Sequence, residues 1–142
     1  MSAPRITPKH GLVLLTPWQT GPAAAPDDTT LVSFTDFRVR RFRDLVPVVK
    51  TAREIYRQWE RRPGSLGLVL WVRPLKRRLG SLSAWDSEAS LKAWINSADH
   101  AQAVRANRPH MRNVASATWT AKRFDLDEAW HEVEWRWMTG KH

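Results

Sequence analysis

Apolar residues alternate with polar ones, or run together, in four stretches of the chain, and both patterns are typical of β-strands. Partial alternation with β-branched and aromatic residues predicts a strand over 31–40. A nearly continuous apolar run predicts a central strand over 65–72, and alternation returns over 79–85. A last strand is predicted over 113–124. The Pro-Leu-Lys-Arg-Arg segment at 74–78 supplies the turn between the second and third strands.

Between the first and second strands the apolar residues recur at three- and four-residue spacing, which predicts an amphipathic helix. Asp44 is a favourable N-cap, and the helix ends at Pro63 and Gly64, which cannot continue it. Its inward positions form one broad stripe: Leu45, Val48, Val49, Ala52, Ile55, Tyr56 and Trp59.

A second helix is predicted between the third and fourth strands. Asp86 or Ser87 caps its start, and residues 96–100, Asn-Ser-Ala-Asp-His, indicate a break. Ser97 is placed to cap the continuation, which stops before Pro109 because proline cannot continue a helix. Leu91, Trp94 and Ile95 face inward in the part that precedes the break.

This element order is β-α-β-β-α-β, which predicts an α+β, ferredoxin-like antiparallel sheet. The regular domain spans 31–124, after an N-terminal arm over 1–30 that contains a segment able to add an edge strand. The Trp-rich extension over 125–142 opens with a capping signal and predicts a helix, although its apolar residues also alternate as in a strand. Helices on one face of a four-stranded sheet leave the other face uncovered, so a homodimer is expected.

The amino-acid composition limits the kinds of site and catalysis that the chain can support. The nine Trp and one Tyr suit pockets and interfaces, because indoles bury large areas. The absence of Cys excludes disulfides, thiolate catalysis and Cys-ligated metal sites, and it fits a cytoplasmic location. The net charge of +9 comes largely from basic runs at 38–43 and 73–78, which fall at turns and are expected to be solvated loop charge. No stretch approaches the roughly 20 apolar residues of a membrane span.

The segment over 82–105, Leu-Ser-Ala-Trp-Asp followed by a helix, a small-residue break and a His, resembles the strand-to-helix signature of the dimeric α/β-barrel monooxygenases. The Pro-Gly entry into the second strand is similar to theirs as well. The resemblance covers 31–124 and is nearest to antibiotic-biosynthesis and spheroidene monooxygenase-like proteins. It implies a dimeric α/β barrel with a pocket between each sheet and its own helices.

Within this resemblance, His100 is the candidate catalytic base, able to take a proton from an acidic C–H or a phenol so that the anion reacts with dioxygen. A core histidine that only bridges helix turns is the structural alternative. Pocket-wall candidates are Trp71, Trp85 and Trp94, and Arg38 and Arg40 are candidates for holding an acidic or phenolate substrate. No site role is expected for His110, which ends a helix, and no metal is expected at His131, which lacks zinc-helix spacing.

The sequence therefore predicts a small monooxygenase-type enzyme of secondary metabolism that acts on a bulky apolar or aromatic substrate without a cofactor. A cyclase or isomerase of a polyketide- or terpenoid-like substrate on the same scaffold is the first alternative. A haem-binding enzyme is the second; the family's haem-ligating His falls one turn beyond His100, where this chain has Val104. A basic nucleic-acid-binding module is the third, and the missing Lys/Arg-Gly-Phe/Tyr strand motif argues against it.

Overall fold

A computed structural model describes residues 3–7 and 11–140, the first segment by its backbone alone. Seven antiparallel strands form one sheet: β1 (Ala3–Thr7), β2 (Gly11–Leu15), β3 (Gln19–Thr20), β4 (Thr30–Val39), β5 (Ser65–Arg73), β6 (Arg78–Trp85) and β7 (Met111–Ala121). The helices are α1 (Leu45–Arg57), α2 (Glu88–Ile95), α3 (Ala98–Asn107) and α4 (Leu126–Thr139). Short 3₁₀ turns are η1 (Phe42–Asp44), η2 (Trp59–Arg61), η3 (Pro74–Lys76) and η4 (Arg108–His110).

The predicted ferredoxin-like arrangement is confirmed. The spatial strand order is β1-β2-β5-β6-β4-β7, and β3 pairs with β5 beside β2. Strands β4, β5, β6 and β7 with α1, α2 and α3 form the expected β-α-β-β-α-β unit, and the first part of the chain lengthens the sheet beyond β5. Three of the four α-helices begin at a capping side chain: Ser87, Ser97 and Asp125 accept hydrogen bonds from backbone amides of α2, α3 and α4.

Asp44 differs from its predicted role. It occupies the N-cap position of α1, yet its side chain makes no cap hydrogen bond to that helix. Its carboxylate instead accepts from the Arg41 amide at 3.0 Å and pairs with the His110 ring at 2.8 Å. These two bonds hold the pKa of Asp44 below its usual value, with the His110 hydrogen bond as the larger cause. Asp44 therefore ties the start of α1 to η4.

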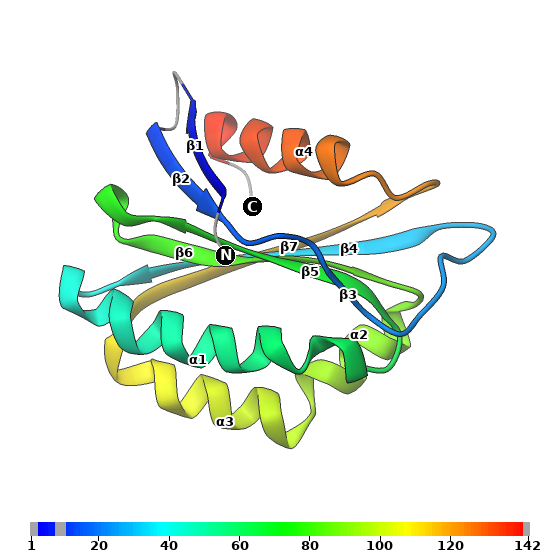
Figure 1. Cartoon of the computed structure of the whole chain (residues 1–142), viewed down its shortest axis with the longest axis horizontal. Coiled ribbons are helices and arrows are strands. Elements are labelled where there is room, and N and C mark those ends of the chain that lie inside the picture. Colours follow the sequence, from blue (N-terminus) through cyan, green and yellow to red (C-terminus); the bar gives the residue numbers. More distant parts are fainter. Residues whose placement is uncertain (1–2, 8–10, 141–142) are drawn as a thin grey trace.

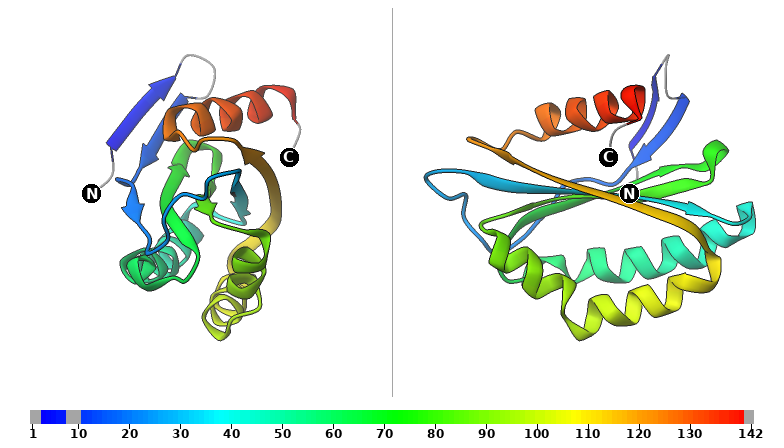
Figure 2. Two further views of the ribbon diagram at one scale, coloured as in Figure 1. Left: turned by 90° about the vertical axis from the view of Figure 1, so that its right-hand side faces the viewer. Right: turned by 180° about the vertical axis from the view of Figure 1, so that it is seen from behind.

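The two faces of the sheet carry different layers. Helices α1, α2 and α3 cover one face, while α4 and the β1–β2 hairpin lie on the other (Figure 1 and Figure 2). Gly67 is needed on β5 because Trp18 lies over it: a Cβ there would stand 2.1 Å from the indole. Between α4 and the sheet lies the main core, formed by Val13, Leu15, Val32, Phe34, Val69, Trp71, Leu82, Ala129, Trp130 and Val133.

This core corrects the reason for expecting a homodimer. The apolar face that four strands alone would leave open is already covered by α4, whose Trp130 and Val133 are fully buried. The C-terminal extension, whose apolar pattern fitted both a helix and a strand, forms this covering helix. A dimer of this chain would therefore form through a different surface from the face that α4 covers.

A polar network fixes α4 to that face. Asp36 of β4 is buried and accepts a hydrogen bond from Trp137 Nε1 at 3.1 Å. Its carboxylate also pairs with the Arg78 guanidinium, whose Nε lies 2.9 Å from Oδ1. The Arg73 guanidinium stands 4.5 Å from the Trp137 ring, a cation–π distance. The C-terminal helix is thus held by specific polar contacts as well as by apolar packing.

Candidate active site

A cavity of about 620 Å³ lies between the sheet and the helices α1, α2 and α3. This volume is within the range of small-molecule pockets, roughly 300–1,000 Å³. The helix side is apolar and includes Ile55, Trp59, Leu91 and Trp94. Ile95 of α2, Val104 of α3 and Val114 of β7 line it and are also exposed, so they mark its rim.

The floor of the cavity is a grid of hydroxyl groups. Ser33 of β4 is in register with Ser83 of β6 and Thr118 of β7. One step along the strands, Thr35 is in register with Ser81 and Ser116. All six line the cavity, because every second side chain of a strand faces the same side.

Three of these hydroxyls are held in place by hydrogen bonds. Thr35 Oγ1 and Ser81 Oγ share a hydrogen bond at 2.7 Å. Trp85 Nε1 donates to Ser83 Oγ at 2.9 Å, and since this bond uses an acceptor position of Ser83, its O–H is left to donate. The floor therefore offers oriented donors and acceptors at the bottom of an apolar space.

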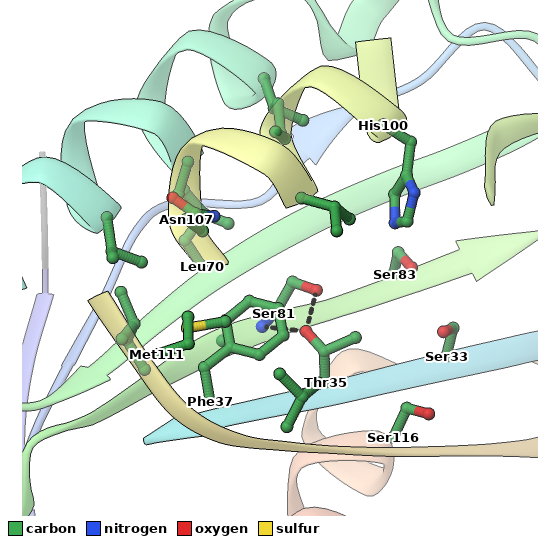
Figure 3. A pocket seen from close by; sticks show the side chains of 18 of the residues that line it. Ser33, Thr35, Phe37, Leu70, Ser81, Ser83, His100, Asn107, Met111 and Ser116 are labelled. Atoms are coloured by element: carbon green, nitrogen blue, oxygen red, sulfur yellow. Dashed lines mark hydrogen bonds between the residues drawn. The ribbon is translucent and has the colours of Figure 1, made fainter. Parts of the chain in front are cut away.

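His100 enters the cavity from the first turn of α3. Ser97 Oγ accepts from the His100 amide at 3.2 Å, which fixes the helix start after the break that follows α2. The imidazole stands edge-on to Trp94, with ring centroids 5.2 Å apart and planes at 79°. In Figure 3 it points from α3 toward the sheet that carries Ser83.

Burial lowers the pKa of His100 below its ordinary value of 6.5, and a hydrogen bond to the backbone of Ile95 offsets this only in part. The ring is thus neutral at neutral pH and has a nitrogen able to accept a proton. The lining includes the cations Arg40, Arg108 and Arg112 and, within the described residues, no Asp or Glu. An anion formed in the cavity would therefore meet hydroxyl donors and positive charge.

No group of three or more His, Asp or Glu side chains in the part of the chain that the structure describes is arranged to hold a metal ion. None of its helices is both long and apolar enough to cross a membrane.

The chain matches no protein-family model, and no curated protein is similar to it. Solved structures do match. A protein of Fusobacterium nucleatum, provisionally named a monooxygenase, superposes with a TM-score of 0.63 at 12% identity over 81% of this chain and 54% of its own. This chain thus spans about half of that protein.

Shorter proteins match over nearly their whole length. One from Nitrosomonas europaea, provisionally named an antibiotic biosynthesis monooxygenase, has a TM-score of 0.59 at 12% identity, over 69% of this chain and 95% of its own. A dimeric protein of unknown function and ferredoxin-like fold from Bacteroides fragilis has a TM-score of 0.55 at 11% identity, over 63% and 94%.

The chain has the fold of the antibiotic biosynthesis monooxygenases. Identities this low establish the fold alone. The N-terminal strands and α4 lie outside the β-α-β-β-α-β unit, and the sequence predicted them only loosely.

On this monooxygenase fold, the structure brings together three of the six residues singled out from sequence: His100, Trp94 and Arg40 all line the cavity. Arg40 Nε also donates to the Met111 carbonyl at 3.0 Å, which places it where β4 and β7 meet. Arg38 does not line the cavity; it is exposed and in register with Arg78 and Asn113.

Two of the predicted pocket tryptophans lie outside the cavity. Trp71 is fully buried on the opposite face of the sheet, stacked on Phe34 beneath α4. Strand alternation explains this, because Leu70 faces the cavity and its neighbour must face away. Trp85 is buried in the cluster with Trp59 and Leu91 and reaches the cavity only through its bond to Ser83.

The hydroxyl floor was missed from sequence, although a signal exists. Three strands carry Ser or Thr at two-residue spacing: 33 and 35, 81 and 83, and 116 and 118. Such spacing puts the hydroxyls of each strand on one face, and antiparallel pairing then aligns them across strands. What the sequence did not supply was the register that joins the three pairs.

Proposed function

We propose that the protein is a monooxygenase-type enzyme that oxidises a bulky apolar or aromatic small molecule in this cavity, with His100 as the general base. The observation that carries the proposal is one neutral imidazole facing an apolar space whose floor consists of hydroxyl groups. The fold likeness to proteins named as monooxygenases supports the reaction class. The cavity volume and indole wall support the substrate class.

The chain's own groups suffice for the first step. His100 takes a proton from an acidic C–H or a phenol of the substrate. The floor hydroxyls donate hydrogen bonds to the oxygen on which negative charge develops, which lowers the barrier. The anion then reduces dioxygen: an activated CH₂ becomes C=O, one oxygen atom enters the product and the other leaves as water. The substrate supplies all four electrons, so this reaction needs no external reductant.

The test is oxygen uptake with a panel of tricyclic compounds that carry an activated methylene beside a phenol. We expect His100→Ala to lower kcat by about 10²–10⁴-fold, the usual contribution of a general base, while the fold is retained. His131→Ala is the matched control, because that imidazole is exposed on α4. Unchanged turnover in the His100 variant would return this residue to a structural role. Product formation without oxygen uptake would identify the cyclase alternative instead.

Haem is a second candidate occupant, favoured by the same imidazole. His100 is held by a backbone hydrogen bond and faces the cavity, which is the arrangement that orients a metal-binding histidine. Arg40 and Arg108 line the cavity and could pair with propionates. Bound haem would supply an iron that activates dioxygen. The test is a haemin titration. A saturating Soret band that is lost in His100→Ala would establish haem binding through His100. The absence of a specific band would favour the cofactor-free reaction.

A further inference from the structure

Three segments of the chain meet at the end of the molecule where α1 begins, and they carry most of its net charge. They span residues 38–46, 74–78 and 108–112. Together they hold nine Arg or Lys and one Asp, a net of +8 out of the +9 of the whole chain. In Figure 1 the β5–β6 turn, the start of α1 and the end of α3 all lie at this end. We call this surface the basic end.

Backbone and side-chain bonds hold the three segments together. The Val39 amide donates to the Arg77 carbonyl at 3.0 Å, and Arg77 Nη1 donates to the Arg40 carbonyl at 2.6 Å. The Arg40 amide donates to the His110 carbonyl at 2.9 Å. The one acid, Asp44, is engaged by the His110 ring and the Arg41 amide. Bonds between the segments thus hold the positive charge of the basic end together. Arg78 is paired with Asp36 of β4, and the segments carry no acid other than Asp44 to neutralise the remaining cations.

Apolar side chains project from the same surface. Leu75 is 74% exposed, Val46 69% and Phe42 59%, which makes them the three most exposed large apolar residues among those described. Leu75 lies in the turn η3 and Phe42 in η1, and the Arg77 guanidinium stands 5.9 Å from the Phe42 ring, so the two turns are adjacent. Exposing apolar side chains to water is unfavourable. Apolar side chains surrounded by cations are the combination that binds the interface of a bilayer with anionic headgroups.

We propose that the basic end binds the surface of an anionic lipid bilayer, with Phe42, Val46 and Leu75 inserted among the headgroups and the surrounding Arg and Lys paired with lipid charge. A nucleic acid would use the cations equally well, but it has no use for an exposed Leu and Val. The apolar residues therefore favour the bilayer.

The cavity reaches this end, since Arg40, Arg108, Met111 and Arg112 are part of its lining. A substrate dissolved in the bilayer would then enter an apolar cavity directly from the membrane. This consequence rests on the proposed function; the lipid binding itself does not, and it is measured without any substrate.

The test is co-sedimentation of the full chain with phosphatidylcholine vesicles, with and without phosphatidylserine, at about 0.1 M salt. We expect binding only to the anionic vesicles. Arg43→Gln with Lys76→Gln should weaken it about 30-fold, because each basic residue near such a surface contributes a factor of about five. Lys122→Gln with Arg123→Gln is the matched charge control; both side chains are exposed after the far end of β7, and this pair should bind as the parent does.

The apolar contribution is tested by Phe42→Ser with Leu75→Ser, which leaves the charge unchanged. We expect at least ten-fold weaker vesicle binding. Failure of the parent chain to sediment with anionic vesicles would overturn the proposal. So would a Phe42 and Leu75 variant that binds vesicles as the parent does. The alternative outcome is that a DNA or RNA oligonucleotide binds tightly and with steep salt dependence. If the Phe42 and Leu75 substitutions left that binding unchanged, the surface would be assigned to nucleic acid.

Discussion

At the scale of single residues, the lowered pKa of His100 has a consequence for the pH dependence of the proposed reaction. The base must be neutral, so kcat/KM should rise with pH and level off, with a midpoint below the ordinary histidine value of 6.5. Measuring kcat/KM as a function of pH gives this midpoint, because kcat/KM reports the ionisation of the free enzyme. A midpoint above 6.5 would mean that burial does not control this imidazole. Stability follows the same sign: the unfolded chain binds more protons at this site, so stability falls as pH drops through 6.5 toward the folded pKa.

Asp36 is the residue on which the attachment of α4 depends most. Asp36→Ala removes the acceptor of Trp137 Nε1 and the partner of Arg78, so we expect a loss of about 3 kcal/mol in the free energy of unfolding. Urea denaturation measures the loss. Asp127→Ala, an exposed acid on α4, is the control and should change stability by less than about 0.5 kcal/mol. Equal effects of both substitutions would contradict a special role for Asp36.

At the scale of elements, β7 is the part of the cavity most open to redesign. Thr118→Trp should block the cavity without disturbing the core, because Thr118 lines the cavity yet is exposed. We expect at least a ten-fold loss of affinity for an apolar fluorescent probe, with an unchanged melting temperature. Thr120→Trp is the matched control: it lies on the same face of the same strand, is exposed and does not line the cavity.

The order and type of the elements in the shared fold were predictable from periodicity and caps, because each element carries its own signal. Ser97 marks the break that aims His100 into the cavity, and that break was visible in the sequence. The side of the sheet on which a tryptophan lies was not predictable. Trp71 and Leu70 are neighbours in one apolar run, and a run without alternation does not show which of its side chains face the cavity. Pairing register, which aligns the floor hydroxyls, is likewise a property of several strands at once.

At the scale of the whole molecule, α4 takes the place that a second sheet would occupy. A chain ending at Phe124 should therefore expose Phe34, Val69, Trp71 and Leu82, and we expect it to self-associate, as large apolar patches do. Light scattering after size exclusion compares its mass with that of the full chain. A monomeric truncated chain with intact secondary structure would show that α4 does not protect this face. A dimer of the full chain that persists after truncation would have to use another surface.

The grid of serines and threonines beneath the cavity has one more consequence. The volume of the cavity is set by side chains that end in a hydroxyl, on strands whose opposite face carries the core beneath α4. Exchanging Ser for Ala, Thr or Val at 33, 81 or 116 would deepen, narrow or dry the cavity one small group at a time, with the fold supported elsewhere. The shape and polarity of the cavity are thus separable from folding, so exchanges at these positions can reshape the cavity while the core beneath α4 stays intact.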